Sequence, residues 1–160
     1  MTSLQHPDVG QPAGPTDPGR SLKLLSVVAP VYNEVATVEQ FYARVCSALQ
    51  GLSFELVLVD DGSSDGSDRE LQKLAMNDPR VRVVQLSRNF GHQTALTAGL
   101  DHARGDAVVM LDADLQDPPE LIPQMLDHWR AGCDVLYAVR EQRDGESRFK
   151  LATARWFYAL

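Results

Sequence analysis

Short apolar segments alternate with amphipathic segments along most of the chain. Five mainly apolar runs of about six residues predict buried strands, at 24–29, 54–59, 81–86, 106–111 and 134–139. Between and after them, spacing and composition predict helices at 38–49, 68–76, 93–103 and 118–131. Asp117 precedes the last helix as a natural N-cap, and Gly132 ends it.

This alternation predicts a doubly wound α/β fold with a mostly parallel sheet, because a helix that joins two parallel strands makes a right-handed crossover. In such folds ligands bind beyond the carboxyl ends of the strands, where the strand order reverses. The loops after the first, second and fourth predicted strands are therefore the expected place for chemistry.

The two ends of the chain differ in composition from the part between them. Residues 1–21 interleave four prolines and three glycines with few apolar side chains, which predicts a disordered tail. Residues 140–160 carry five Lys and Arg side chains against three carboxylates, together with Phe149, Trp156 and Phe157. We expect this segment either as an amphipathic helix at a membrane interface or as a terminal helix that packs on the sheet.

Composition narrows the function classes. The chain has 160 residues, of which 44% are hydrophobic and 23% charged, the content of one globular domain. Its net charge of −7 argues against binding nucleic acid through a basic face. Cys46 and Cys133 are too few and too far apart for a zinc cluster or a disulfide framework. Because we find neither a run of about 18 apolar residues nor a signal peptide, we expect a cytoplasmic or peripheral protein.

Carboxylates gather in the three loops where ligands are expected. The loops read Pro30-Val31-Tyr32-Asn33-Glu34, Asp60-Asp61-Gly62-Ser63 and Asp112-Ala113-Asp114-Leu115-Gln116. So many like charges at one sheet edge repel one another, and a divalent cation removes that repulsion. Oxygen ligands alone favour a hard ion such as Mg²⁺ or Mn²⁺.

The third loop is the expected metal site. Asp112, Asp114 and Gln116 alternate with apolar residues, so an extended segment would turn all three toward one ion. An ion with few protein ligands keeps positions for phosphate oxygens, which implies a diphosphate ligand.

The other two loops offer contacts for a nucleotide. Tyr32 is suited to pack on a base, Asp61 to accept hydrogen bonds from the base edge, and Glu34 to accept them from ribose hydroxyls. Neither G-x-G-x-x-G nor a P-loop is present, so a metal takes the place of a backbone phosphate cradle.

Several residues also have a purely structural explanation, which stays open at this point. Asp60 suits a turn, Asp117 a helix cap, His92 a capping or solvent-exposed position, and Arg88 a solvated charge.

Residues 28–34, 59–63 and 112–120 carry a family resemblance. In this order they resemble the family 2 glycosyltransferases of GT-A type, and especially the polyprenyl-phosphate branch with dolichol-phosphate mannosyltransferase and undecaprenyl-phosphate glucosyltransferases. The resemblance covers about residues 23–160. It implies a GT-A, Rossmann-like nucleotide-sugar-binding domain over 22–140, followed by the amphipathic segment 141–160. It also implies a member truncated at the C-terminus, because relatives continue well past the position of Leu160.

The resemblance implies site residues position by position. Those expected to hold the nucleotide are Pro30, Tyr32, Glu34, Val59, Asp61, Asp112 and Ala113. Those expected to hold the metal are Asp112, Asp114 and Gln116. Arg140 matches an arginine that meets the donor phosphates, so the expected catalytic residues are Asp112, Asp114 and Arg140. The segment 87–92 resembles one that follows the third strand in bacterial relatives, and its role stays open.

The implied reaction moves a sugar from a UDP- or GDP-linked donor to a polyprenyl phosphate, with inversion and with Mg²⁺ or Mn²⁺, at the cytoplasmic face of a membrane. One alternative is a non-catalytic fragment or pseudoenzyme that only binds the nucleotide sugar. A phosphotransfer domain is a third interpretation. It is disfavoured because the Asp-x-Asp pair follows the fourth strand and not the first.

Overall fold

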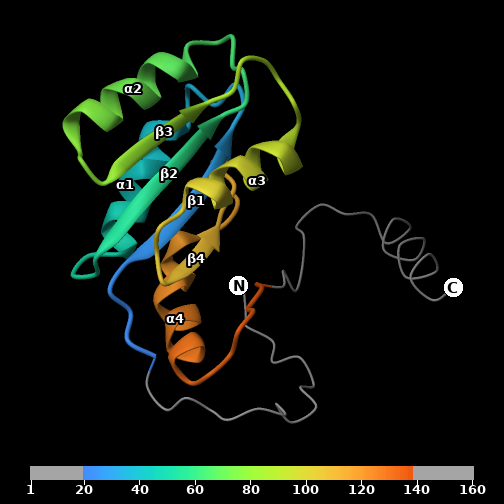
Figure 1. Ribbon diagram of the computed structural model, residues 1–160. Helices are drawn as coiled ribbons and strands as arrows, with labels where there is room; N and C mark the ends of the chain where they lie inside the picture. Colours follow the sequence, from blue (N-terminus) through green and yellow to red (C-terminus); the bar gives the residue numbers. More distant parts are fainter. Residues whose placement is uncertain (1–19, 139–160) are drawn as a thin grey trace, which may run out of the picture.

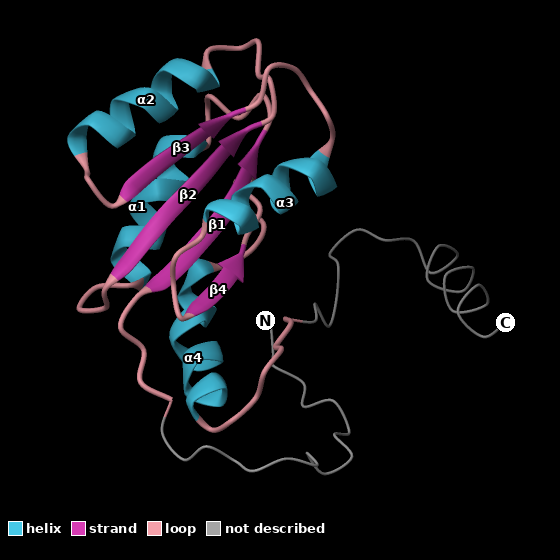
Figure 2. Cartoon of the chain, viewed as in Figure 1, coloured by secondary structure: helices cyan, strands magenta, loops and turns pink. Residues whose placement is uncertain are grey.

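The structure, a computed structural model, describes residues 20–138 (Figures 1 and 2). Its strands are β1 (Leu25–Val31), β2 (Phe54–Asp60), β3 (Val81–Gln85) and β4 (Ala107–Met110). All pair in parallel, in the order β3-β2-β1-β4. The helices are α1 (Val38–Ala48), α2 (Ser67–Asn77), α3 (His92–His102) and α4 (Ile122–Arg130), with a 3-10 turn η1 (Pro119–Leu121) before α4. The predicted doubly wound parallel sheet is confirmed.

The helices cover both faces of the sheet. Phe41 of α1, Leu71 of α2 and Ile122 of α4 pack in one apolar core with the side chains of one face of β1 and β2. On the opposite face, Ala95 of α3 packs against Val28 and its neighbours. Figure 1 shows α3 in front of the strands and α1 behind them. Burial on both faces explains why the central strands read as continuous apolar runs.

The strand order reverses between β1 and β4. The chain moves outward from β1 through β2 to β3, and α3 then returns it across the other face to β4. Val28 of β1 pairs with Met110, the last residue of β4, so the loops that follow these strands leave the sheet side by side. This reversal places a ligand crevice beyond their carboxyl ends.

The small residues of α3 allow it to approach β1 closely. A Cβ atom built on Gly99 would lie 2.3 Å from Val28 Cγ1, far inside van der Waals contact. The close packing fixes the position of α3, and with it His92 at the start of that helix.

The predicted fifth strand is wrong over its described part. Residues 134–138 form no strand, and β4 pairs with β1 alone among the described strands. Val135 and Tyr137 are 83% and 63% exposed. The run therefore lacks both a hydrogen-bonded neighbour and a buried face, which an apolar strand requires.

Asp117 does not cap the last helix. Pro118 occupies the cap position before η1, and no side chain caps that turn. Pro118 is held in an extended conformation, with ψ near 112°, because it precedes Pro119. The start of the helical segment is thereby moved one residue further along the chain.

The described residues include the last two of the predicted tail, 20 and 21. The Arg20 guanidinium donates to the carbonyl of Cys133, pairs with Asp134 and lies 5.5 Å from the centre of the Trp129 ring. The rest of the tail, the segment 141–160 and Arg140 lie outside the described residues. Within the described part, we find no helix of the length and apolarity that a membrane crossing needs.

Candidate functional site

A cavity of about 240 Å³ opens at the carboxyl edge of the sheet. Its walls come from the ends of β1 and β2, the loop before α3 and the loop after β4. The lining residues are Pro30, Val31, Tyr32, Glu34, Asp61, Asn89, Gly91, His92, Asp112, Ala113 and Asp114. The sequence prediction that Asp61 and Asp112 meet at one edge is confirmed.

A larger cavity of about 570 Å³ lies along β4 and α4. Apolar side chains such as Val109, Met125 and Trp129 make up much of its lining. None of the described residues to which the resemblance assigns a nucleotide or metal role lines it. The smaller cavity therefore holds the candidate chemistry.

The loop after β1 is held in place by the loop after β2. Asn33 adopts a left-handed conformation with φ near 56°, and its side-chain oxygen accepts a hydrogen bond from Ser64 N. Glu34 N donates to Ser67 Oγ, and Val35 N donates to Asp65 Oδ2. These contacts turn the half-exposed ring of Tyr32 and the Glu34 carboxylate toward the cavity.

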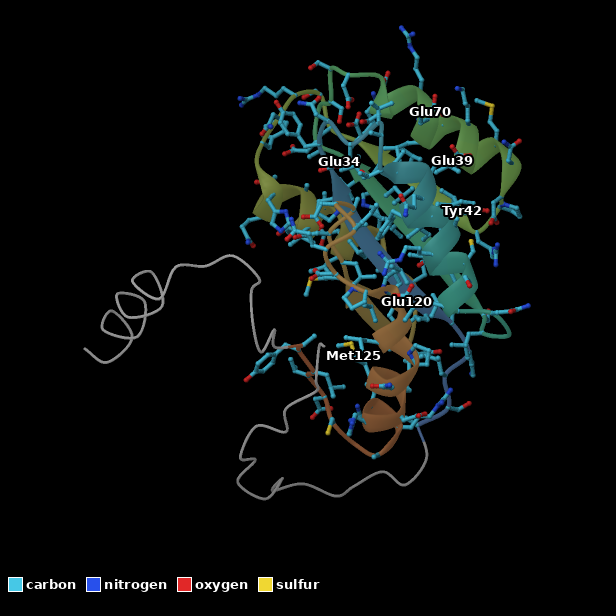
Figure 3. All side chains as sticks on the ribbon, turned by 180° about the vertical axis from the view of Figure 1, so that it is seen from behind. Glu34, Glu39, Tyr42, Glu70, Glu120 and Met125 are labelled. Carbon is cyan, nitrogen blue, oxygen red and sulfur yellow. The ribbon has the colours of Figure 1, made fainter. Side chains whose placement is uncertain are left out.

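Sequence reasoning missed these anchoring residues. Their signal is the density of Asn, Asp and Ser in both loops, since these side chains bind nearby backbone amides. The pattern indicated turns, and it did not indicate that the two turns bind each other. Figure 3, which views the molecule from behind, shows Glu34 at the end of the molecule where the loops after β1 and β2 lie.

The two adjacent aspartates at the end of β2 have different roles. Asp60 accepts a hydrogen bond from Ser63 N at 3.0 Å, which confirms its turn-setting role. Asp61 is only 3% exposed, and its two oxygens accept hydrogen bonds from Phe90 N at 2.8 Å and Gly91 N at 2.9 Å. Asp61 therefore connects the second strand end to the loop before α3.

Asp112 stands in a crowded electrostatic environment. Burial raises the pKa of its carboxyl above the usual value; His92 opposes this shift, whereas the negative charges of Asp117 and Asp114 add to it. His92 Nε2 lies 3.7 Å from Asp112 Oδ1. His92, for which the sequence left two explanations open, thus lines the cavity beside this carboxylate.

The extended alternation predicted for the third loop is wrong. β4 ends at Met110, and Leu115 has a left-handed backbone with φ near 67°. The Asp114 side chain accepts a hydrogen bond from Gln116 N at 2.9 Å, an Asx turn that replaces the extended chain. Asp112 and Asp114 still line the cavity, whereas Gln116 is exposed outside its lining.

Arg44 on α1 contacts the turn formed by residues 114–116. Its guanidinium donates to both carboxylate oxygens of Glu120, at 3.1 and 2.8 Å, and to the carbonyl of Leu115 at 3.3 Å. Figure 3 shows Glu120 beside α1. Sequence reasoning missed this contact, because nothing in the local pattern connects residues 76 positions apart.

The carboxylates fit a divalent cation that is shared with a ligand. Within residues 20–138, no three His, Cys, Asp or Glu side chains are grouped so that they hold an ion by themselves. Asp112 and Asp114 nevertheless line one cavity. Burial raises the pKa of Asp112, the nearby carboxylates add to that shift, and a bound cation would offset both effects. Their oxygen donors suit a hard divalent cation such as Mg²⁺ or Mn²⁺.

One further predicted residue among those described does not line the cavity. The Val59 side chain is fully buried against Val28 and Ala95 under α3, and Val59 does not line the cavity. Arg140 lies outside the described residues. The cavity thus brings together Pro30, Tyr32, Glu34, Asp61, Asp112, Ala113 and Asp114 out of the predicted set.

The sheet and cavity define the GT-A class of glycosyltransferase folds. A mannosyltransferase from Pyrobaculum calidifontis, solved in complex with GDP-Man and Mn²⁺, is similar with a TM-score of 0.60 and 26% identity. The similarity covers 74% of this chain and 34% of that one. The family model for glycosyl transferase family 2 matches residues 26–158, so the chain belongs to that family.

Two curated relatives give the same result. The chain is 49% identical over 137 residues to the uncharacterised glycosyltransferase YkcC of Bacillus subtilis. It is 44% identical over 138 residues to the bactoprenol glucosyl transferase of Shigella phage SfV. The matches cover 84% and 85% of this chain, but only 42% and 45% of those proteins. The chain therefore spans less than half the length of these relatives.

Proposed function

We propose that this chain binds a nucleoside-diphosphate sugar through a divalent cation and is the donor-binding part of an inverting polyprenyl-phosphate glycosyltransferase. The observation that carries the proposal is the single cavity in which Tyr32, Asp61 and Asp112 meet from three different strand ends. The similar mannosyltransferase with GDP-Man and Mn²⁺, and the bactoprenol glucosyl transferase relative, support the donor and the acceptor respectively.

The cavity residues divide into a nucleotide end and a diphosphate end. The Tyr32 ring packs on the base beside Pro30, and the Glu34 carboxylate, oriented by a 2.6 Å hydrogen bond from Thr37 Oγ1, accepts from ribose hydroxyls. Asp112 and Asp114 would hold Mg²⁺ or Mn²⁺ at the diphosphate. When bound, the ion supplies Lewis-acid stabilisation of the departing nucleoside diphosphate.

The chemistry places few demands on a protein base. An oxygen of the acceptor phosphate forms a bond to the anomeric carbon while the bond from that carbon to the diphosphate breaks, which inverts the configuration. A phosphate monoester is already largely anionic at neutral pH, so no strong general base is needed to activate it. Because the acceptor is a lipid, the reaction takes place at a membrane surface, which we propose to be the cytoplasmic one.

Transfer of label tests this function. The protein is incubated with Mn²⁺, undecaprenyl phosphate in vesicles, and UDP-glucose or GDP-mannose labelled in the sugar, and the lipid is extracted. We expect label in the lipid, lost with Asp114→Asn. The matched control is Asp101→Asn, which neutralises an exposed carboxylate on α3 that does not line the cavity.

Binding of the donor is measured separately, because the chain spans less than half of its relatives. Metal-dependent donor binding without any transfer would support the donor-binding role and contradict sugar transfer by this chain on its own. Absence of donor binding would contradict the proposal as a whole.

A further inference from the structure

His92 lines the cavity, but the proposed function gives it no role. It is the only basic side chain in the lining that residues 20–138 form. The ionisable carboxyl groups of the same lining belong to Glu34, Asp61, Asp112 and Asp114. Carboxylates only accept hydrogen bonds, so an imidazole placed among them can supply one of them with a donor.

The backbone sets the position of His92. Gly91, directly before it, has φ near 94° and ψ near 155°, a conformation that residues with a Cβ atom rarely adopt. The Gly91 carbonyl accepts hydrogen bonds from the amides of Thr94 and Ala95, which form the first turn of α3. Ala95 is fully buried against the sheet. The helix therefore begins at a fixed place, and its first side chain lies at the cavity.

The His92 ring lies beside Asp112. Its Nε2 is 3.7 Å from Asp112 Oδ1, and both side chains are half exposed. Within residues 20–138, no other basic side chain lies within ion-pair distance of Asp112. Asp114 differs, because its carboxylate accepts a hydrogen bond from Gln116 N within its own loop. The polar contact available to orient Asp112 is therefore the one with His92.

This contact needs a hydrogen-bond donor and does not need a charge. A neutral imidazole that carries its proton on Nε2 can donate to a carboxylate, as an imidazolium can. The distance in the structure is about 0.5 Å beyond the usual upper limit of about 3.2 Å for such a bond. A rotation of either half-exposed side chain can close that gap. In metal sites, loss of a donor that orients a ligand typically lowers metal affinity about 10- to 100-fold.

We propose that His92 is a positioning residue, which orients the Asp112 carboxylate for the cation and acts on the nucleotide only through that carboxylate. The inference rests on the proposed function, because it assumes that Asp112 and Asp114 share a cation with a nucleoside diphosphate. Each of the two carboxylates then has its own support. The turn at 114–116 orients Asp114, and α3 orients Asp112 through His92.

Two substitutions separate the donor from the rest of the side chain. His92→Phe keeps a planar ring and removes both ring nitrogens. His92→Gln keeps an N–H donor at the position of Nε2. The matched control is His102→Phe, the same change at the other end of α3, where the histidine is exposed and does not line the cavity.

Affinities for UDP and GDP are measured by calorimetry with saturating Mn²⁺ and again with EDTA, and weak binding is followed by nuclear magnetic resonance. With Mn²⁺, we expect His92→Phe to weaken binding about tenfold and His92→Gln to stay within about threefold of the unsubstituted protein. With EDTA, both variants should match the unsubstituted protein within about twofold. His102→Phe should have no effect in either condition.

A double-mutant cycle tests whether His92 acts through Asp112. In an Asp112→Asn background, His92→Phe should change the affinity with Mn²⁺ by less than about twofold, because the carboxylate that it orients is gone. An equal weakening with and without Asp112, or with and without Mn²⁺, would overturn the proposal, because His92 would then act on the nucleotide directly.

Full affinity with Mn²⁺ in a folded His92→Phe variant would also overturn the proposal. If His92→Phe does not fold, His92→Ala takes its place in every comparison. Failure of the unsubstituted protein to bind either nucleotide with Mn²⁺ contradicts the proposed function. Binding that depends on Mn²⁺ but not on His92 contradicts only the role of His92, so the two failures are distinguishable.

Discussion

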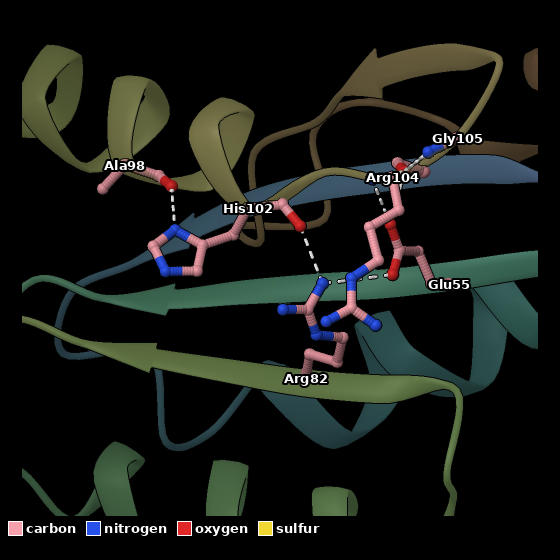
Figure 4. A network of polar contacts seen from close by, with 7 residues as sticks. Glu55, Arg82, Ala98, His102, Arg104 and Gly105 are labelled. Carbon is pink, nitrogen blue, oxygen red and sulfur yellow. Dashed lines mark hydrogen bonds and ion pairs between the residues drawn. The ribbon is translucent and has the colours of Figure 1, made fainter.

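Glu55 and Asp112 lie at opposite edges of the same sheet and differ in their surroundings. Glu55, near the amino end of β2, is 6% exposed and accepts hydrogen bonds from Ser26 Oγ at 2.6 Å, Arg104 N at 2.7 Å and Arg82 Nη1 at 3.3 Å (Figure 4). Asp112, beyond β4, has a half-exposed side chain beside two other carboxylates.

The pKa values move in opposite directions for this reason. Burial alone would raise the pKa of the Glu55 carboxyl, but the hydrogen bonds from Ser26, Arg104 and Arg82 outweigh it and hold the pKa below its usual value. For Asp112, burial raises the pKa and the neighbouring aspartates add to the shift. A carboxylate whose charge the fold fully satisfies is structural, whereas one whose charge the fold leaves unsatisfied at a cavity is suited to bind a cation.

The largest effect is expected from removing the negative charge of Asp112 at the carboxyl edge of the sheet. Asp112→Asn should lower sugar transfer about 1,000-fold, because it removes a ligand of the ion that stabilises the leaving diphosphate. Its free energy of unfolding should stay the same or rise, since a repulsive charge is lost. Labelled-lipid assays and urea unfolding measure the two quantities. A variant that is inactive only because it is unfolded would contradict the comparison.

Removing the hydrogen-bonded carboxylate of Glu55 should instead act on stability. Glu55→Ala leaves the Ser26 hydroxyl without its acceptor and removes one acceptor each from the Arg104 amide and the Arg82 guanidinium, which keep Ser26 Oγ and the His102 carbonyl. We expect a cost of about 3 kcal/mol in the free energy of unfolding. Glu39→Ala, at an exposed glutamate on α1, is the control and should change that free energy by less than about 0.5 kcal/mol. Equal unfolding midpoints for the two variants would contradict this account of the amino edge.

Substitution of Arg44, which contacts the loop that carries Asp112 and Asp114, should have a smaller effect. Arg44→Lys loses the paired hydrogen bonds to Glu120 and the bond to the Leu115 carbonyl, which we expect to lower stability by about 1 kcal/mol. Mn²⁺-dependent nucleotide affinity should fall several-fold with it. Glu120→Gln tests the same contact from its other side, and unchanged nucleotide affinity in both variants would show that the turn does not depend on Arg44.

The smallest effect is a dependence on pH. Because the folded-state pKa of Glu55 lies below its usual value of 4.5, its stabilising contribution is complete above that value and is lost as the pH falls through the folded-state pKa. The difference in unfolding free energy between the unsubstituted protein and Glu55→Gln should be constant from pH 7 to about pH 5. It should shrink below about pH 4. Urea unfolding across this range checks it, and a difference that grows with acidity would show that the sign is wrong.

The apolar runs were enough to predict the sheet and the edge at which the acidic residues meet. They fix which residues are buried, and parallel strands bring their carboxyl ends together. The shape of the metal loop was not predictable, because the left-handed Leu115 depends on the Asx turn at Asp114 and on Arg44 behind it. The prediction of a strand at 134–139 was wrong over 134–138 for a related reason. A strand needs a neighbouring strand to pair with, and the local sequence pattern does not show whether one is there.

The different roles of Asp60 and Asp61 show the same limit of prediction for single residues. Local turn chemistry indicated the role of Asp60, whose acceptor binds an amide three residues away. Asp61 binds amides about 30 positions further along the chain, and only the packing of α3 against the sheet brings them to it.

Paramagnetic broadening tests the central claim most directly. Mn²⁺ and a nucleoside diphosphate are added to the isotopically labelled protein, with Mg²⁺ as the diamagnetic reference, and the amide resonances are compared. We predict that Ala113 and Asp114 at the carboxyl edge are broadened most, only when metal and diphosphate are both present, and that Glu55 and Arg104 are affected least. Strongest broadening at the amino edge, or the same broadening without the diphosphate, would contradict the claim that the open carboxylates hold a cation together with its diphosphate.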